Sequence, residues 1–166
     1  MFELKRITSA GIATALQKAE RYRLLNEPSA AESICLDVLA VEPDNQAALV
    51  QLALARSDQF GGDLAGAVER AGEPLTRVVD PYKRAYYGGI VCERRAKASL
   101  RAASPASAAI AYDWLRRAMD LYEEAERLRP AGHDEALLRW NTCARIIERH
   151  GLTADDEERF EPAIGE

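Results

Sequence analysis

Few residues in this chain of 166 combine the types and spacing that catalysis or metal binding requires. Its three cysteines, Cys35, Cys92 and Cys143, are far apart, and no pair has the short spacing of a zinc or redox motif. The two histidines, His133 and His150, have no serine or cysteine at a spacing that suggests a nucleophile with its base. We therefore expect no catalytic residue, no metal site and no cofactor, and hence no enzyme.

Two further motifs favour the same conclusion. Gly61-Gly62 could begin a phosphate-binding loop, but no Lys-Ser or Lys-Thr pair follows it. Glu123-Glu124 are adjacent carboxylates, which in a helix lie on neighbouring exposed faces and do not form an acid–base pair.

The most regular charged pattern is basic. Lys83, Arg94, Lys97 and Arg101 follow one another at separations of eleven, three and four residues, which places them on one stripe of a helix. A basic stripe attracts acidic segments, and one such segment, Asp155 to Glu161, lies in this chain. Two interpretations remain open. In the first, the stripe binds an acidic segment; if that segment is the chain's own tail, Phe160 and Ile164 are apolar anchors in the groove described below. In the second, the stripe is a solvated helix face.

The negative charge of the chain is confined to its end. The net charge is −5, and residues 152–166 alone carry six acids against one arginine, so the preceding 151 residues are neutral. Nucleic-acid binding requires a basic domain or face, and a neutral body does not favour it. We divide the chain into a helical domain, 1–151, and a mobile acidic tail, 152–166.

Apolar residues recur at three- and four-residue steps along most of the chain, which predicts helices. Ser29 with Glu32, then Asp44 or Asn45, Asp63, Asp80 and Asp134 are the expected helix starts, and Gly151 is an expected stop. A weak helix after Asp63 should be interrupted near Gly72–Pro74. The other six predicted helices cover about 8–25, 29–41, 46–59, 81–102, 105–128 and 134–150.

Three prolines, Pro43, Pro81 and Pro130, follow helical segments, and two of those segments end alike. In both, small and large residues alternate at helical spacing before the proline. The residues are Ala19, Tyr22, Ala31, Cys35, Val38 and Pro43 in one unit, Leu52-Ala53 in the next, and Ala118, Tyr122, Ala125 and Pro130 in the last. This pattern resembles the tetratricopeptide repeat over about residues 8–150.

The resemblance implies an all-α, antiparallel helix-turn-helix array of about seven helices: three irregular pairs and a closing C-terminal helix. Successive prolines are 38 and 49 residues apart, where the family expects about 34. The longer interval predicts that helices 81–102 and 105–128 exceed the usual length and project as a hairpin. Gly88-Gly89 in mid-helix implies close helix approach or room for a ligand backbone.

In such arrays the first helix of each pair lines a concave groove. The resemblance implies that Val50 and Leu54 are groove residues, whereas they would be core residues if an unseen helix covered them. The mapped groove comprises Ala13, Leu16, Gln17, Glu20, Leu24, Ala47, Val50, Gln51, Leu54, Asp58, Cys92 and Arg95, together with the glycines at 88 and 89.

These observations predict a protein–protein interaction module, an adaptor or assembly factor that binds a partner's peptide or segment in the groove. One alternative is a secretion-type chaperone for exported subunits. Another is a scaffold that forms homo-oligomers by docking its tail or hairpin into the next copy. No apolar run approaches a membrane span, and the odd, dispersed cysteines favour a reducing compartment, so we expect a cytoplasmic protein.

Overall fold

The computed structural model describes residues 2–61, 66–102, 104 and 106–154, and these residues form an all-α fold. Short 3-10 helices precede α1 (Ser9–Gly11) and follow α4 (Glu73–Arg77). The seven α-helices of the described residues are α1 Ile12–Leu24, α2 Pro28–Val41, α3 Gln46–Asp58, α4 Ala67–Gly72, α5 Pro81–Ala102, α6 Ser107–Leu128 and α7 Glu135–His150. The predicted fold class is confirmed.

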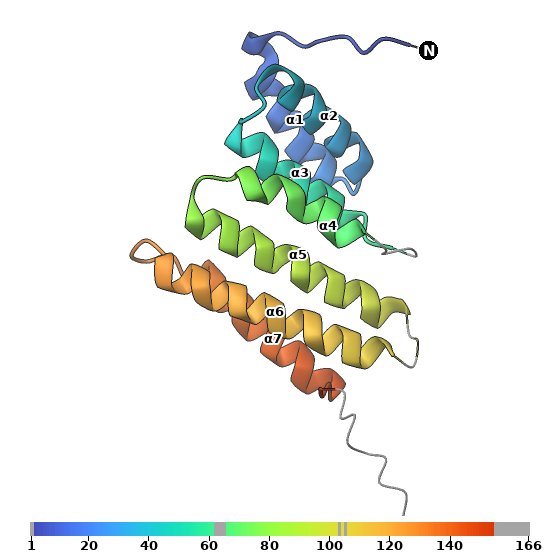
Figure 1. Ribbon diagram of the computed structural model, residues 1–166, viewed down its shortest axis with the longest axis vertical. Helices are drawn as coiled ribbons and strands as arrows, with labels where there is room; N and C mark the ends of the chain where they lie inside the picture. The colour runs from blue at the N-terminus through green and yellow to red at the C-terminus, as the bar shows by residue number, and fades with distance from the viewer. Residues whose placement is uncertain (1, 62–65, 103, 105, 155–166) are drawn as a thin grey trace, which may run out of the picture.

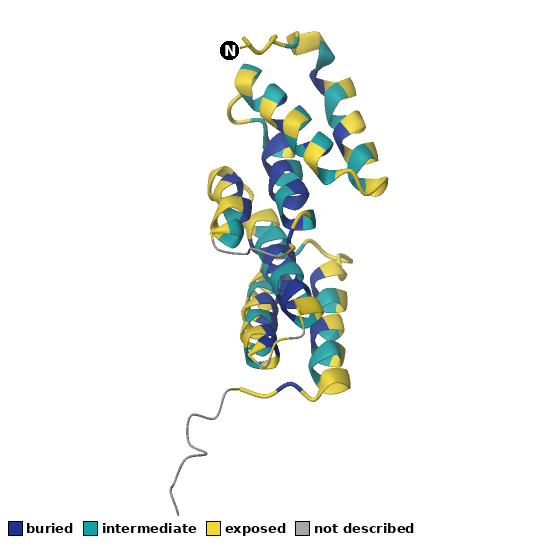
Figure 2. Ribbon diagram, turned by 90° about the vertical axis from the view of Figure 1, so that its right-hand side faces the viewer, coloured by how far each residue is buried: buried dark blue, intermediate teal, exposed yellow. Residues whose placement is uncertain are grey.

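The helices run back and forth and stack along the long axis of the molecule, from α1 at one end to α7 at the other (Figure 1). Each helix packs on the next, and α5 contacts α3 as well as α4. The helices α1, α3 and α5 also touch in succession, which is the contact pattern of a helical repeat. Figure 2 shows buried positions along the middle of the stack and exposed positions on its outer faces.

Small residues allow α1, α2 and α3 to pack closely. Ala19, Ala31, Cys35 and Ala55 are all fully buried in one cluster, with Leu52 beside them. Alanine also has the highest helix propensity, so the same residues favour helix formation and close packing. The small and large residues on which the repeat pattern rests in α1, α2, α3 and α6 lie in the core or at its edge.

The helices α5 and α6 are each 22 residues long, which confirms the predicted long hairpin. Their contact is close because Gly89 faces Tyr122, a fully buried side chain of α6. Of the two alternatives that the glycine pair left open, close helix approach is therefore the one found at Gly89. Gly88 also faces α6, where its nearest neighbour is Leu121.

Two predicted caps are confirmed. The side chain of Asn45 accepts a hydrogen bond from the backbone nitrogen of Ala48 at 3.0 Å, at the start of α3. Asp80 Oδ1 accepts hydrogen bonds from the backbone nitrogens of Tyr82 and Lys83 at the start of α5. Gly151 ends α7 in the left-handed conformation, at φ 57°, as its position predicted.

One predicted cap is wrong, and one predicted helix start lacks a side-chain cap. The capping box at Ser29 does not form, because Pro28 is already the first residue of α2 and Glu32 instead pairs with Arg56 of α3. Asp134 directly precedes α7, as predicted, but its carboxylate is paired with Arg129 at 2.9 Å and makes no cap hydrogen bond. At both positions an ion pair engages the carboxylate that local capping would use.

The other sequence boundaries are partly described. Asp63 lies outside the described residues, and α4 begins after Gly66, which has φ 68°. The interruption near Gly72–Pro74 is present, since α4 ends at Gly72 and a 3-10 helix continues the chain. Leu152, which we assigned to the tail, is buried in the core, so the helical domain extends past residue 151. Residues 155–166 of the predicted tail lie outside the description.

Candidate functional site

The first helices of the three pairs, α1, α3 and α5, enclose an open groove of about 460 Å³. Nine residues line it: Glu20, Arg23, Gln46, Ala47, Val50, Gln51, Leu54, Lys83 and Tyr87. Five of these, Glu20, Ala47, Val50, Gln51 and Leu54, were predicted groove residues, and the structure brings them together.

The apolar part of the groove is continuous with the core. Leu54 is 9% exposed and belongs to the large cluster that α6 and α7 complete. Val50 is half-buried and packs against that cluster and the one beneath α4. The groove and core interpretations of Val50 and Leu54 are therefore compatible, since each side chain packs in the core and presents part of its surface to the groove.

An ion-paired network joins the three helices beside the groove. Asp58 of α3 accepts from Arg23 of α1 at 2.7 Å and pairs with Arg94 of α5 at 2.9 Å. Arg94 also donates to the Leu54 carbonyl and to Ser57 Oγ. Burial lowers the pKa of the Arg94 guanidinium, and the charge of Asp58 opposes that shift. Asp58 is thus a structural residue at the groove wall.

The groove also presents polar groups without partners. Lys83 is exposed and forms no ion pair with any described residue, and the same holds for Glu20. The Oε1 atom of Gln51 is buried and accepts no hydrogen bond from the described chain. A buried acceptor without a donor costs free energy, which a bound N–H group would recover if the amide turned toward the groove.

Four predicted residues of α1 lie elsewhere, among them Ala13, which is exposed outside the groove lining. Leu16 packs into a separate cluster with Ile12, Val38 and Ala48. Gln17 is exposed on the outer side of α1, and Leu24 is 83% exposed near the end of that helix. The groove uses the narrower strip of α1 that contains Glu20 and Arg23, because α2 and α3 cover its remaining inner surface.

The prediction that Cys92 and Arg95 of α5 line the groove is wrong. Cys92 is half-buried in the cluster shared with α6, and Arg95 lies over the Trp114 ring of α6, 5.8 Å from its centroid. Gly88 and Gly89 face α6 as well. The long hairpin occupies this side of α5, so its residues cannot line the groove.

The groove face of α5 carries Lys83 and Tyr87 instead. Tyr87 was not predicted as a groove residue, although it follows Lys83 by one helical turn and precedes Arg94 by two. The basic stripe was thus the available signal for this face. Burial raises the pKa of the Tyr87 hydroxyl, which keeps it neutral as a hydrogen-bond donor.

The basic stripe itself divides into three environments. Lys83 lines the groove, while Arg94 is committed to Asp58. Lys97 and Arg101 line a second hollow, between α5 and α7. The four residues do not form one docking surface.

Glu93 is a buried charged residue that we did not predict. It is 1% exposed and accepts hydrogen bonds from Lys97 at 2.5 Å, Tyr122 at 2.7 Å and Arg139 at 3.1 Å. Burial acts to raise the pKa of the Glu93 carboxyl, but bonds from Lys97 and Tyr122 and the charges of Lys97 and Arg139 hold that pKa below its usual value. The cluster ties α5, α6 and α7 together.

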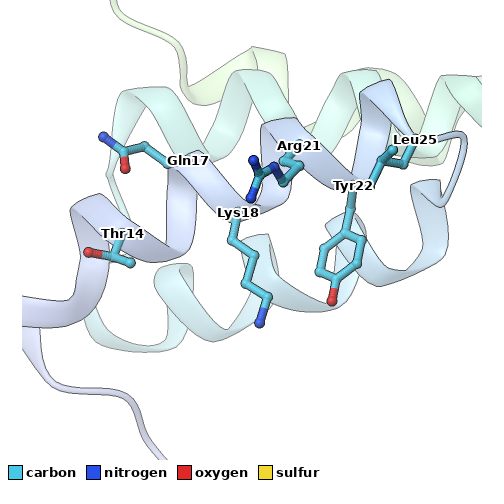
Figure 3. A pocket seen from close by; sticks show the side chains of 6 residues that line it. All are labelled: Thr14, Gln17, Lys18, Arg21, Tyr22 and Leu25. Atoms are coloured by element: carbon cyan, nitrogen blue, oxygen red, sulfur yellow. The ribbon is translucent and has the colours of Figure 1, made fainter.

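A hollow on α1 has a different character. It measures about 710 Å³, and its six lining residues, Thr14, Gln17, Lys18, Arg21, Tyr22 and Leu25, all come from α1 or its C-terminal end (Figure 3). Lys18 lies over the Tyr22 ring, 5.7 Å from its centroid. One helix alone gives no opposing wall, so this hollow is the uncovered end face of the stack.

The described residues contain no group of three or more His, Cys, Asp or Glu side chains that could hold a metal ion. Burial raises the pKa of the Cys35 and Cys92 thiols to about 11 and that of Cys143 to about 12. A reactive thiolate is thereby disfavoured at all three cysteines.

No protein-family model, curated protein or solved structure matches this chain. Within the described part of the chain, no helix is long and apolar enough to cross a membrane.

Proposed function

We propose that this protein is an interaction module that binds an extended or helical segment of another protein in the α1/α3/α5 groove. The observation that carries the proposal is the groove itself, which three sequence-distant helices line with apolar residues at its base and polar residues at its rim. This composition is typical of peptide-binding grooves. The helix order and the buried small residues support a tetratricopeptide-like repeat as its scaffold.

The lining determines the chemistry of the ligand. Val50 and Leu54 are one helical turn apart and offer a base for an aliphatic side chain. Gln51 supplies amide groups for a peptide backbone. Lys83 and Glu20 bear opposite charges on different helices, so they favour a segment with one acidic and one basic residue and fix its direction.

A reducing, cytoplasmic location is part of the proposal. All three cysteines are free, and burial raises the pKa of each thiol. The thiolate that disulfide formation requires is therefore disfavoured, which suits a reducing compartment.

The test selects ligands without assuming their identity. The full-length protein is used to enrich a phage-displayed library of random peptides, and fluorescein-labelled copies of enriched peptides are titrated by fluorescence anisotropy. The test variant is Ala47→Glu/Lys83→Glu, which changes two exposed lining residues and leaves the core intact. The control, Arg127→Glu/Leu138→Glu, alters exposed residues of α6 and α7.

We expect the groove variant to bind the enriched peptides about tenfold more weakly, a loss of about 1.4 kcal/mol, and the control variant to bind like the wild type. Equal binding by all three proteins would place the site outside the groove. Failure to enrich any peptide would also contradict the proposal.

A further inference from the structure

A second hollow, of about 570 Å³, lies between the C-terminal half of α5 and the helix α7. Its lining comprises Lys97, Leu100, Arg101, Thr142, Arg145, Ile146, Arg149 and His150. Leu100 and Ile146 are partly buried and form an apolar strip between the two basic edges. Among the described residues the lining has four lysine or arginine side chains and no carboxylate. This basic hollow lies at the opposite end of α5 from the proposed peptide groove and does not depend on it.

The positive charge of the basic hollow is largely unpaired. Arg145 and Arg149 are exposed and form no ion pair with any described residue. Lys97 is paired with Glu93, but Arg139 neutralises the same carboxylate, so that cluster retains a net charge of about +1 at neutral pH. The Arg101 side chain makes a single hydrogen bond within the described part of the chain, to the Phe60 carbonyl. Anionic groups are therefore attracted to this site.

The described chain ends beside the basic hollow. His150 is the last residue of α7 and lines the hollow. Gly151 then turns the chain, the backbone nitrogen of Leu152 donates to the Ile147 carbonyl at 3.0 Å, and the Leu152 side chain is buried. Whatever follows Ala154 thus begins within a few residues of the basic side chains.

The sequence that follows complements this surface. Residues 155–158 are Asp-Asp-Glu-Glu, and Phe160 and Glu161 come soon after. Along α7 the hollow extends from Thr142 to His150, about 12 Å at a rise of ~1.5 Å per residue. Seven extended residues reach about 23 Å, so residues 155–161 suffice to cover it. A tether this short also gives a high effective concentration, on the order of millimolar.

We propose that the basic hollow between α5 and α7 binds the chain's own acidic segment, residues 155–161. The carboxylates pair with Arg101, Arg145 and Arg149, and Phe160 packs on Leu100 and Ile146. The chain thereby occupies, with its own residues, a site that would otherwise attract acidic segments of other proteins.

Two measurements on the full-length protein test the proposal. In the first, a carbodiimide couples carboxylates to amines that they touch, and the products are mapped by mass spectrometry. Lys97 is the only lysine of the basic hollow, so we expect it to be joined to a carboxylate of residues 155–161, whereas Lys83 is not. A mixture of unlabelled and ¹⁵N-labelled protein shows whether the joined residues belong to one molecule.

In the second measurement, trypsin cleavage after Arg159 reports how often the segment is released. We expect Arg145→Gln/Arg149→Gln to be cleaved there about fivefold faster than the wild type, since two exposed charge pairs together contribute about that factor. The control, Arg116→Gln/Arg127→Gln, makes the same change of charge on exposed positions of α6 and should be cleaved at the wild-type rate.

Absence of coupling to Lys97, together with equal cleavage of all three proteins, would overturn the proposal. Mixed products, of one labelled and one unlabelled peptide, at the level expected for random pairing of molecules would also overturn it, because the occupant would then be a second copy.

Discussion

The ring of Tyr122 occupies the space that a side chain on Gly89 would need. A Cβ atom at position 89 would lie 2.5 Å from Cε1 of Tyr122, closer than real Cβ contacts allow. The ring cannot easily retreat, because it is fully buried and its hydroxyl donates to Glu93 at 2.7 Å. The glycine therefore fixes both the α5–α6 distance and the position of the Glu93 cluster.

We expect Gly89→Ala to destabilise the protein by about 1–2 kcal/mol, since overpacking exceeds the gain in helix propensity. Gly88→Ala is the matched control, because its Cβ would meet Leu121 at an ordinary 3.4 Å. That variant should be unchanged or stabilised by up to about 1 kcal/mol. Urea unfolding followed by circular dichroism measures both, and equal effects of the two variants would contradict the packing argument.

Glu93 should make the stability depend on pH in the acid range. Its pKa in the folded protein lies below the ordinary value of 4.5, so its stabilising contribution is present above that value and is lost as the pH falls through the folded pKa. At pH 7 we expect Glu93→Gln to cost about 3 kcal/mol, because Lys97 and Arg139 lose their partner.

The difference between wild type and Glu93→Gln should shrink as the pH is lowered from about 5 to about 3. Urea unfolding at each pH measures it. Glu124→Gln, an exposed change on α6, serves as the control and should have little effect at any pH. A difference that stays constant or grows in acid would show that the Glu93 pKa is not lowered.

Asp58→Ala should also destabilise the protein strongly. It removes the common partner of Arg23 and Arg94, of which Arg94 is partly buried, and we expect a loss of about 3 kcal/mol. By contrast, Glu73 is exposed and forms long pairs of 3.9 Å, so Glu73→Ala should cost no more than about 0.5 kcal/mol. Chemical denaturation distinguishes the two, and similar losses would show that the network at the groove wall is not stabilising.

The reactivity of the cysteines tests whether α6 covers the face of α5 that carries Cys92. With a pKa of about 11 and cover from α6, Cys92 should react with iodoacetamide at pH 7.5 about 100-fold more slowly than an unhindered thiol. Cys35 and Cys143 should be slower still, and all three should react rapidly in denaturant. Rapid modification of native Cys92, located by peptide mass spectrometry, would show that this face is open after all.

Most of the fold could be predicted because its signals are local. The periodicity that predicted a helix over 81–102 reflects burial of one side, and Asp80-Pro81 fixes its start. The Ser29 capping box failed because the competing partner of Glu32 is Arg56, 24 residues away. Local patterns do not reveal such distant partners.

The candidate site was predictable on α3 and only partly elsewhere. Val50, Gln51 and Leu54 follow directly from the repeat resemblance. On α5 the expected face was displaced by one residue, about 100° around the helix, since the irregular proline spacing gives no secure register. The Glu93 cluster was not predictable, because its partners Tyr122 and Arg139 are 29 and 46 residues distant.

The unequal burial of the helices that line the groove has a consequence for how a ligand enters it. Of the 13 residues of α1 only Ile12 and Ala19 are buried, whereas α5 buries eight and is anchored through Glu93. In a stacked array each helix is stabilised by its neighbours alone, so detaching α1 from the groove costs less free energy than detaching α5. Its amide hydrogens should exchange first. A ligand that fills the groove would slow the amide exchange of α1. Ligand binding would thus be detected as a local ordering at one end of the molecule.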